Sequence, residues 1–71
     1  MALEFPTMAD RAIADFEGAT KTVSLVVIAK RHGGERDRKA PDNSIVFRFD
    51  DDTALVIEGR GRGHRYRAEL P

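Results

Sequence analysis

The side chains best suited to chemistry gather near the C-terminus, where glycine, arginine and aromatic residues follow one another over residues 59–67. An arginine guanidinium presents a planar set of donors that can hold a phosphate through two hydrogen bonds. Glycines let a backbone approach a ligand closely, and the rings of His64 and Tyr66 could stack on unpaired bases. The segment therefore predicts a surface for nucleic acid or for a protein partner, formed by Arg60, Arg62, His64, Arg65 and Arg67.

A structural role for the same residues stays open. Arg65 and Arg67 could pair across strands with acidic side chains such as Glu58, and Tyr66 could belong to the core. The formal net charge is zero and the isoelectric point is about 6.7, values that are not typical of a dedicated DNA-binding protein.

A second basic cluster lies in residues 32–44, which Gly33, Gly34 and Pro41 interrupt and through which no apolar period runs. A loop of 13 residues is long for a small domain, so we expect it to be functional or mobile. Its candidate binding residues are Arg36, Arg38 and Lys39. If this loop folds beside residues 60–67, the two clusters form one basic surface, and the sequence leaves that arrangement open.

Charge alternates along the chain in four zones. Two zones are basic: residues 21–40 carry six basic and two acidic residues, and residues 60–71 carry four basic and one acidic residue. Two zones are acidic: residues 1–20 carry one basic and four acidic residues, and residues 41–59 carry one basic and five acidic residues. Opposed charge zones can steer a macromolecular partner. We therefore expect a small non-enzymatic interaction or regulatory module that contacts a protein partner. The alternative is a nucleic-acid-binding protein that uses the arginine-rich hairpin.

Other residues with catalytic potential lack the spacing that catalysis needs. Ser24 and Ser44 lie outside a Gly-x-Ser-x-Gly element, and His32 and His64 do not have the spacing of metal ligands. The acidic run 50–52 lacks the spacing of a calcium loop and is typical of a turn. A chain of 71 residues also has little material left for pocket walls once its core is built. We expect no enzymatic activity, no metal and no cofactor.

The chain shows no targeting or membrane signal. Its longest apolar run, Leu25–Ala29, is five residues, whereas a membrane helix needs about 20. The first residues lack the basic and apolar regions of a secretory signal. These features predict a soluble, cytoplasmic protein that does not associate with membranes.

Hydrophobic periodicity predicts one helix and four strands in a single domain over residues 1–71. Thr7 and Asp10 have capping-box spacing, and the apolar residues that follow recur at helical intervals, which predicts a helix over 7–17. Alternating or β-branched runs predict strands over 20–31, 45–50, 53–58 and 64–70. The expected fold is α+β, with one N-terminal helix packed on a four-stranded antiparallel sheet whose last three strands form a meander.

The two strands 20–31 and 53–58 are apolar on both faces, but one helix covers only one face of a sheet. Burying an exposed Val or Ile is worth about 1.5–3 kcal/mol, which favours covering the second face. No disulfide can add stability, because the chain has no cysteine. We therefore expect an open sheet that forms a homodimer, with a small SH3-like or Sm-like barrel as the alternative.

Overall fold

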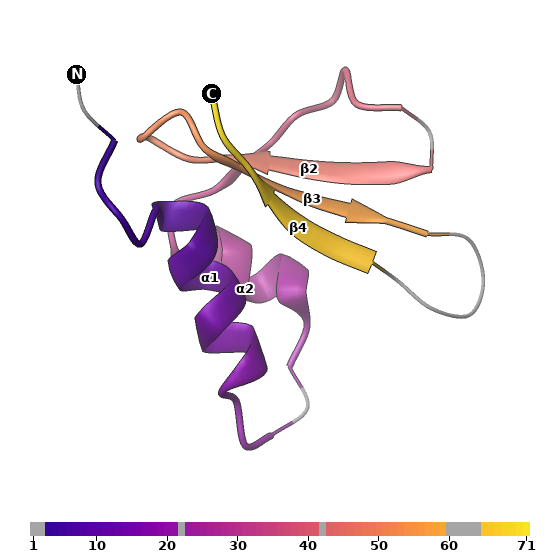
Figure 1. Ribbon diagram of the computed structural model, residues 1–71. Coiled ribbons are helices and arrows are strands. Elements are labelled where there is room, and N and C mark those ends of the chain that lie inside the picture. Colours follow the sequence, from indigo (N-terminus) through magenta and orange to yellow (C-terminus); the bar gives the residue numbers. More distant parts are fainter. Residues whose placement is uncertain (1–2, 22, 42, 60–64) are drawn as a thin grey trace.

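The computed structural model describes residues 3–21, 23–41, 43–59 and 65–71. These form two helices and a four-stranded antiparallel sheet in which the strands follow one another in the order β1-β2-β3-β4 (Figure 1). The elements are α1 (Met8–Glu17), α2 (Leu25–Arg31), β1 (Glu35–Arg36), β2 (Ser44–Arg48), β3 (Ala54–Glu58) and β4 (Arg65–Glu69). The predicted α+β class and the C-terminal meander are confirmed. The described strands form an open sheet with β1 and β4 at its edges, not the barrel considered as the alternative.

Helix α1 begins as the sequence predicts. The backbone N–H of Asp10 donates to the Thr7 hydroxyl at 3.1 Å, and the Asp10 carboxylate accepts the backbone N–H of Thr7 at 3.4 Å. This capping box satisfies backbone donors that a helix N-terminus otherwise leaves without partners. The helix ends at Gly18, whose N–H donates to the carbonyl of Ala14 at 2.9 Å.

The prediction of a strand over residues 20–31 is wrong, because residues 25–31 form helix α2. The buried residues of this helix are Leu25, Ile28 and Ala29. Their i, i+3, i+4 spacing places them on one stripe, which faces the core. The chain therefore has a second helix, and both helices lie on the same face of the sheet (Figure 1).

The residues of α2 explain why the strand was the more natural expectation. Val26, Val27 and Ile28 are β-branched, and β-branching lowers helix propensity and raises strand propensity. An apolar run of this length also fits a buried helix as well as a buried strand by periodicity alone. Tertiary packing decides the outcome, since the helical form buries Leu25, Ile28 and Ala29 together on one stripe and leaves Val27 45% exposed.

The fourth strand is β1, which lies inside the segment predicted to be a loop. It pairs with β2, with Glu35 opposite Arg48 and Arg36 opposite Phe47. Gly34 makes the approach to this strand possible. A Cβ atom there would lie 2.9 Å from the Ala29 carbonyl oxygen and 3.0 Å from the Phe49 ring. Only glycine fits this contact without displacing a neighbour.

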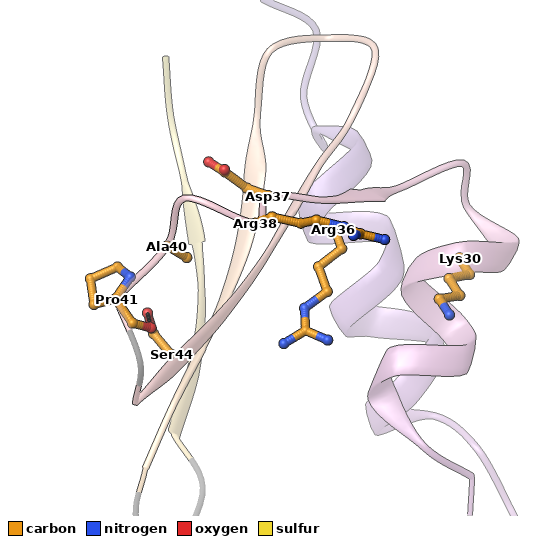
Figure 2. Close-up of a pocket in the computed structure, with 7 residues that line it drawn as sticks. All are labelled: Lys30, Arg36, Asp37, Arg38, Ala40, Pro41 and Ser44. Atoms are coloured by element: carbon orange, nitrogen blue, oxygen red, sulfur yellow. Dashed lines mark hydrogen bonds between the residues drawn. The ribbon is translucent and has the colours of Figure 1, made fainter.

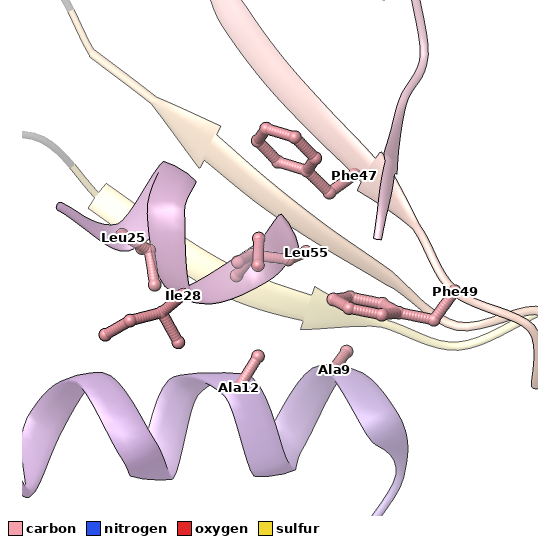
Figure 3. Close-up of a cluster of buried hydrophobic side chains, with 8 residues drawn as sticks. Ala9, Ala12, Leu25, Ile28, Phe47, Phe49 and Leu55 are labelled. Carbon is pink, nitrogen blue, oxygen red and sulfur yellow. The ribbon is translucent and has the colours of Figure 1, made fainter. Parts of the chain in front are cut away.

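The main core lies between the helices and the sheet (Figure 3). Its largest fully buried apolar side chains are Phe47, Ile28 and Leu55. On the opposite face of the sheet a smaller cluster contains Val46, Ala54 and Val56, all buried, with Ala40 packed against it. The chain itself therefore buries apolar residues on both faces. The premise of an uncovered second face is not met, and the homodimer stays a prediction.

Candidate functional site

The residues that line one charged hollow come from α2, β1, the segment that follows β1 and the start of β2 (Figure 2). We call this hollow, of about 530 Å³, the basic groove. Its lining residues are Lys30, Arg36, Asp37, Arg38, Ala40, Pro41 and Ser44. Two of the three predicted residues of the second basic cluster, Arg36 and Arg38, lie in it, whereas Lys39 is not part of its lining.

Strand register and helix position bring the cations of the basic groove together. Arg36 lies opposite Phe47, so its side chain shares the sheet face that carries the helices. Lys30 lies in the last turn of α2, where a positive charge also interacts favourably with the helix dipole. In Figure 2 the cationic ends of Lys30, Arg36 and Arg38 face the space between α2 and the segment after β1.

The one carboxylate in the lining is already engaged. Asp37 accepts the backbone N–H of Lys39 at 2.9 Å and the Nε–H of Arg48 at 3.0 Å. The Lys39 hydrogen bond, followed by the Arg48 hydrogen bond, lowers the pKa of Asp37 below its ordinary value. The charge of Asp37 is therefore balanced by Arg48, which lies outside the lining.

The other three charged side chains of the lining are cations without such a partner in the described structure. The ion pairs among the described residues join Arg48 to Asp37 and Arg67 to Glu58 and Glu69, and His32 makes a hydrogen bond with Asp15. None of these pairs includes Lys30, Arg36 or Arg38, and all three side chains are exposed. The basic groove therefore offers three positive charges to an anion from solution.

The arginine-rich C-terminal segment is only partly described. Arg60, Arg62 and His64 lie outside the described residues. Arg65 and Arg67 are exposed in β4, and Arg67 donates to Glu58 at 3.3 Å and to Glu69 at 3.5 Å. Arg67 thus makes the cross-strand pairing that the structural alternative predicts. Pairs this exposed contribute at most about 1 kcal/mol to stability.

Tyr66 contacts the protein rather than open solvent. Its ring meets that of Phe16 edge to face, with 5.6 Å between the ring centroids, and its hydroxyl donates to the Glu17 carboxylate at 3.0 Å. The bond to Glu17, together with some burial, raises the pKa of the Tyr66 phenol. These contacts tie β4 to α1, and they occupy the ring that the sequence offered for base stacking.

The two segments that contain the basic clusters meet at one end of the sheet. The N–H of Gly59 donates to the carbonyl of Asn43 at 3.4 Å, so the residues that flank the two segments meet. Their described arginines nevertheless lie apart. Arg36 is in one edge strand and Arg65 is in the other, and three strand spacings separate the two edges by about 14 Å. Among the described residues, the clusters form two surfaces and not one.

Lys30 is the functional candidate that the sequence analysis missed. A strand over 20–31 places it on an extended chain far from any defined partner, whereas helix α2 brings it opposite Arg36 and Arg38. The signal that could have found it is the i, i+3, i+4 spacing of Leu25, Ile28 and Ala29.

Metal-ligating side chains do not gather in the described ranges. No three His, Asp or Glu residues there lie close enough together to hold a metal ion. The Nε2 atom of His32 instead lies 3.1 Å from an Asp15 carboxylate oxygen, which links the two helices at the surface. Neither α1 nor α2 has the length and hydropathy to cross a bilayer.

Comparison with known proteins gives no family for this chain. Its sequence matches no protein-family model and no curated protein, and its structure matches no solved structure. The function is therefore inferred from the basic groove and the charges around it.

Proposed function

We propose that this chain is a small non-enzymatic module that binds the phosphate backbone of a nucleic acid through the basic groove. The observation that carries the proposal is the convergence of Lys30, Arg36 and Arg38 on one hollow, outside every ion pair of the described residues. Lysine and arginine form strong charge-assisted hydrogen bonds with phosphate oxygens. Sites for small molecules are lined mainly by apolar side chains, so the charged lining favours a polyanion over a small organic ligand.

Contact with phosphates rather than bases follows from the side chains available. The lining of the basic groove has no aromatic residue, and the ring of Tyr66 is engaged by Phe16. Phosphate contacts position a nucleic acid but carry no sequence information. We therefore expect binding that depends strongly on salt and little on base sequence.

A binding role without catalysis is supported by the state of the hydroxyl and imidazole groups. The Ser44 hydroxyl in the groove donates to the Pro41 carbonyl at 3.2 Å, and His32 is held by Asp15 on another surface. Nucleophilic catalysis needs a nucleophile and a base within reach of one another. The Ser44 hydroxyl and the His32 ring have other partners and do not form such a pair. In the proposed role the protein acts in the cytoplasm by contact alone, without a cofactor.

A protein partner is the second candidate. The acidic turn 50–52 joins β2 to β3 at the end of the sheet opposite Asn43 and Gly59, where its exposed carboxylates Asp50 and Asp52 could contact a basic partner. We propose that one such partner is a second copy of the chain, because β4 leaves one edge of the sheet uncovered by any described strand.

Fluorescence anisotropy with short labelled oligonucleotides tests the nucleic-acid proposal. Single-stranded oligothymidylate and a duplex would be titrated with wild type, with the double variant Arg36→Ala and Arg38→Ala, and with the double variant Arg11→Ala and Lys21→Ala. The second double variant removes the same charge from exposed sites outside the groove lining. We expect the groove variant to weaken binding by about tenfold or more, from two lost charge-assisted contacts. The control variant should stay close to wild type.

Three results would contradict the proposal. Equal weakening by both double variants would show that net charge and not the groove binds. Absence of binding at low salt would remove nucleic acid as the ligand. Tighter binding to a labelled polyglutamate peptide than to either oligonucleotide would identify an acidic protein as the better partner for the groove.

A further inference from the structure

Strand β4 presents a five-residue outer edge with which no described strand pairs. The opposite edge, β1, is only two residues long. Natural sheets commonly protect an edge by keeping its strand short, whereas a longer edge offers a row of backbone donors and acceptors for another strand. The edge of the sheet that can accept a partner strand is therefore β4.

Two backbone hydrogen bonds at the ends of the β2–β3 ladder show which backbone groups of β3 point toward β2. The N–H of Phe49 donates to the carbonyl of Thr53 at 2.9 Å, and the N–H of Gly59 donates to the carbonyl of Asn43 at 3.4 Å. Hydrogen-bonded and non-hydrogen-bonded pairs alternate in an antiparallel ladder. The odd-numbered residues of β3 therefore bond to β2, and the even-numbered residues bond to β4.

The register carries this alternation into β4. Val56 lies opposite Arg67 and Ala54 lies opposite Glu69, so Arg67 and Glu69 direct their backbone groups toward β3. Tyr66 and Ala68 then direct their N–H and C=O groups toward the outer edge. A partner strand would form its hydrogen bonds with these two residues and with Leu70, which follows them in the alternation.

We propose that a second copy of this chain pairs antiparallel along β4, about a two-fold axis through Ala68. This register places Arg67 opposite Glu69 of the second copy, and Glu69 opposite Arg67 of the second copy. Opposite charges on directly facing positions stabilise a strand pair. The neighbouring symmetric registers face Arg67 with Arg67 or Glu69 with Glu69, and like charges on facing positions destabilise the pair. Charge complementarity therefore selects this register.

The same register covers an exposed apolar side chain. Leu70 is 54% exposed in the single chain. In the pair it lies opposite Tyr66 of the second copy, on the sheet face that carries the helices. Pro71 has no N–H to donate. Its place in the alternation directs its backbone away from the second copy, so the pairing needs no hydrogen bond from it. The two ends of β4 thus suit the pairing that the charges select.

This interface deepens the proposed homodimer and rests on it, but it is independent of the basic groove, which lies beside β1 at the other edge of the sheet. Sedimentation velocity at several micromolar concentrations would be measured for wild type, Arg67→Glu, Glu69→Arg and the double variant that exchanges both charges. Two like-charge pairs per dimer should weaken dimerisation by about tenfold in each single variant. The double variant should recover most of the loss. Arg65→Glu is the matched control, because Arg65 faces Pro71 and no charge of the second copy.

A cysteine at the two-fold axis provides a second measurement. The chain has no cysteine of its own. In the proposed pair the two Ala68 Cα atoms lie about 5.5 Å apart, within the range that a disulfide spans. Oxidised Ala68→Cys should therefore migrate as a covalent dimer, and Ala14→Cys, exposed on α1, should stay largely monomeric. Circular dichroism of every variant separates loss of pairing from loss of fold.

The outcomes distinguish the interface from the dimer. Wild-type protein that stays monomeric would overturn both the homodimer and this interface. If the charge variants do not change the dimerisation affinity and position 68 does not cross-link, the interface is overturned and the homodimer stands. Neither result bears on oligonucleotide binding by the basic groove.

Discussion

The Asp51 carboxylate accepts the backbone N–H of Met8 at 2.8 Å, across 43 positions of sequence. Asp51 lies in the turn between β2 and β3, and Met8 is the first residue of α1. The neighbouring Thr53 hydroxyl, which is fully buried, accepts the N–H of Ala9 at 3.3 Å. The sheet turn therefore supplies acceptors to the start of α1 in addition to the local cap from Thr7, and it docks the helix on the sheet.

Removing the Asp51 acceptor should destabilise the protein. In Asp51→Ala the N–H groups of Met8 and Thr53 lose their partner, and the first turn of α1 loses a favourable negative charge. Loss of a helix-capping side chain costs about 1 kcal/mol, and up to about 2 kcal/mol where the cap is well formed. Urea unfolding followed by circular dichroism measures this difference. Asp50→Ala, a change at an exposed carboxylate of the same turn, is the control, and an equal loss in both variants would contradict the capping role.

The same carboxylate should make stability depend on acid pH. Burial raises the pKa of Asp51, but the hydrogen bonds from Met8 and Thr53 outweigh it, so the pKa falls below its ordinary value of 3.8. A lowered pKa in the folded state means that the contribution is complete well above pH 3.8 and is lost as pH falls through the folded-state pKa. The difference in unfolding free energy between wild type and Asp51→Asn should therefore shrink as the pH falls below 3.8. A difference that stays constant through the acid range would show that Asp51 does not act through its charge.

Gly34 should tolerate no side chain. The added Cβ atom of Gly34→Ala would meet a carbonyl oxygen of α2 at 2.9 Å and the Phe49 ring at 3.0 Å. Overpacking of this kind typically costs about 1–3 kcal/mol. Because Gly34 brings β1 against α2, the variant should also move Arg36 relative to Lys30 and weaken oligonucleotide binding at a temperature where the protein is folded. Gly18→Ala, where the added atom meets one helix carbonyl at 3.2 Å, should have the smaller effect on stability and none on binding.

The parts of the fold that the sequence predicts are those fixed by local signals. Thr7 and Asp10 mark the start of α1 because capping is a contact between residues three positions apart. Alternation identifies β2, β3 and β4, and the acidic run 50–52 identifies the turn between the first two. Asp52 adopts a φ of 66°, a conformation that aspartate accepts more readily than most residues. Helix 7–17 and the meander follow from neighbours in sequence.

The parts that the sequence does not predict depend on distant contacts. Helix α2 forms because Ile28 packs into a core that includes residues of α1, β2 and β3, and this overrides its β-branched composition. The basic groove could not be predicted from the sequence for the same reason, since Lys30 lies beside the same hollow as Arg36 only when residues 25–31 are helical. The role of Asp51 is invisible in sequence because its partner Met8 is 43 positions away. The paired cation Arg67 and the available cation Arg36 also look alike until the strand register is known.

The salt dependence of oligonucleotide binding should report how many phosphates the cations of the basic groove contact. Each phosphate that a cation neutralises releases condensed counterions and adds about −0.7 to the slope of log K against log salt concentration for a single strand. Three contacts, from Lys30, Arg36 and Arg38, predict a slope of about −2 between about 50 and 200 mM salt. Arg36→Ala should reduce the magnitude of that slope by close to one contact, and Arg11→Ala should leave it unchanged. A slope that falls equally in both variants would mean that the strand does not lie in the groove. An unchanged slope in Arg36→Ala, even with weaker binding, would mean that Arg36 shapes the groove without touching a phosphate.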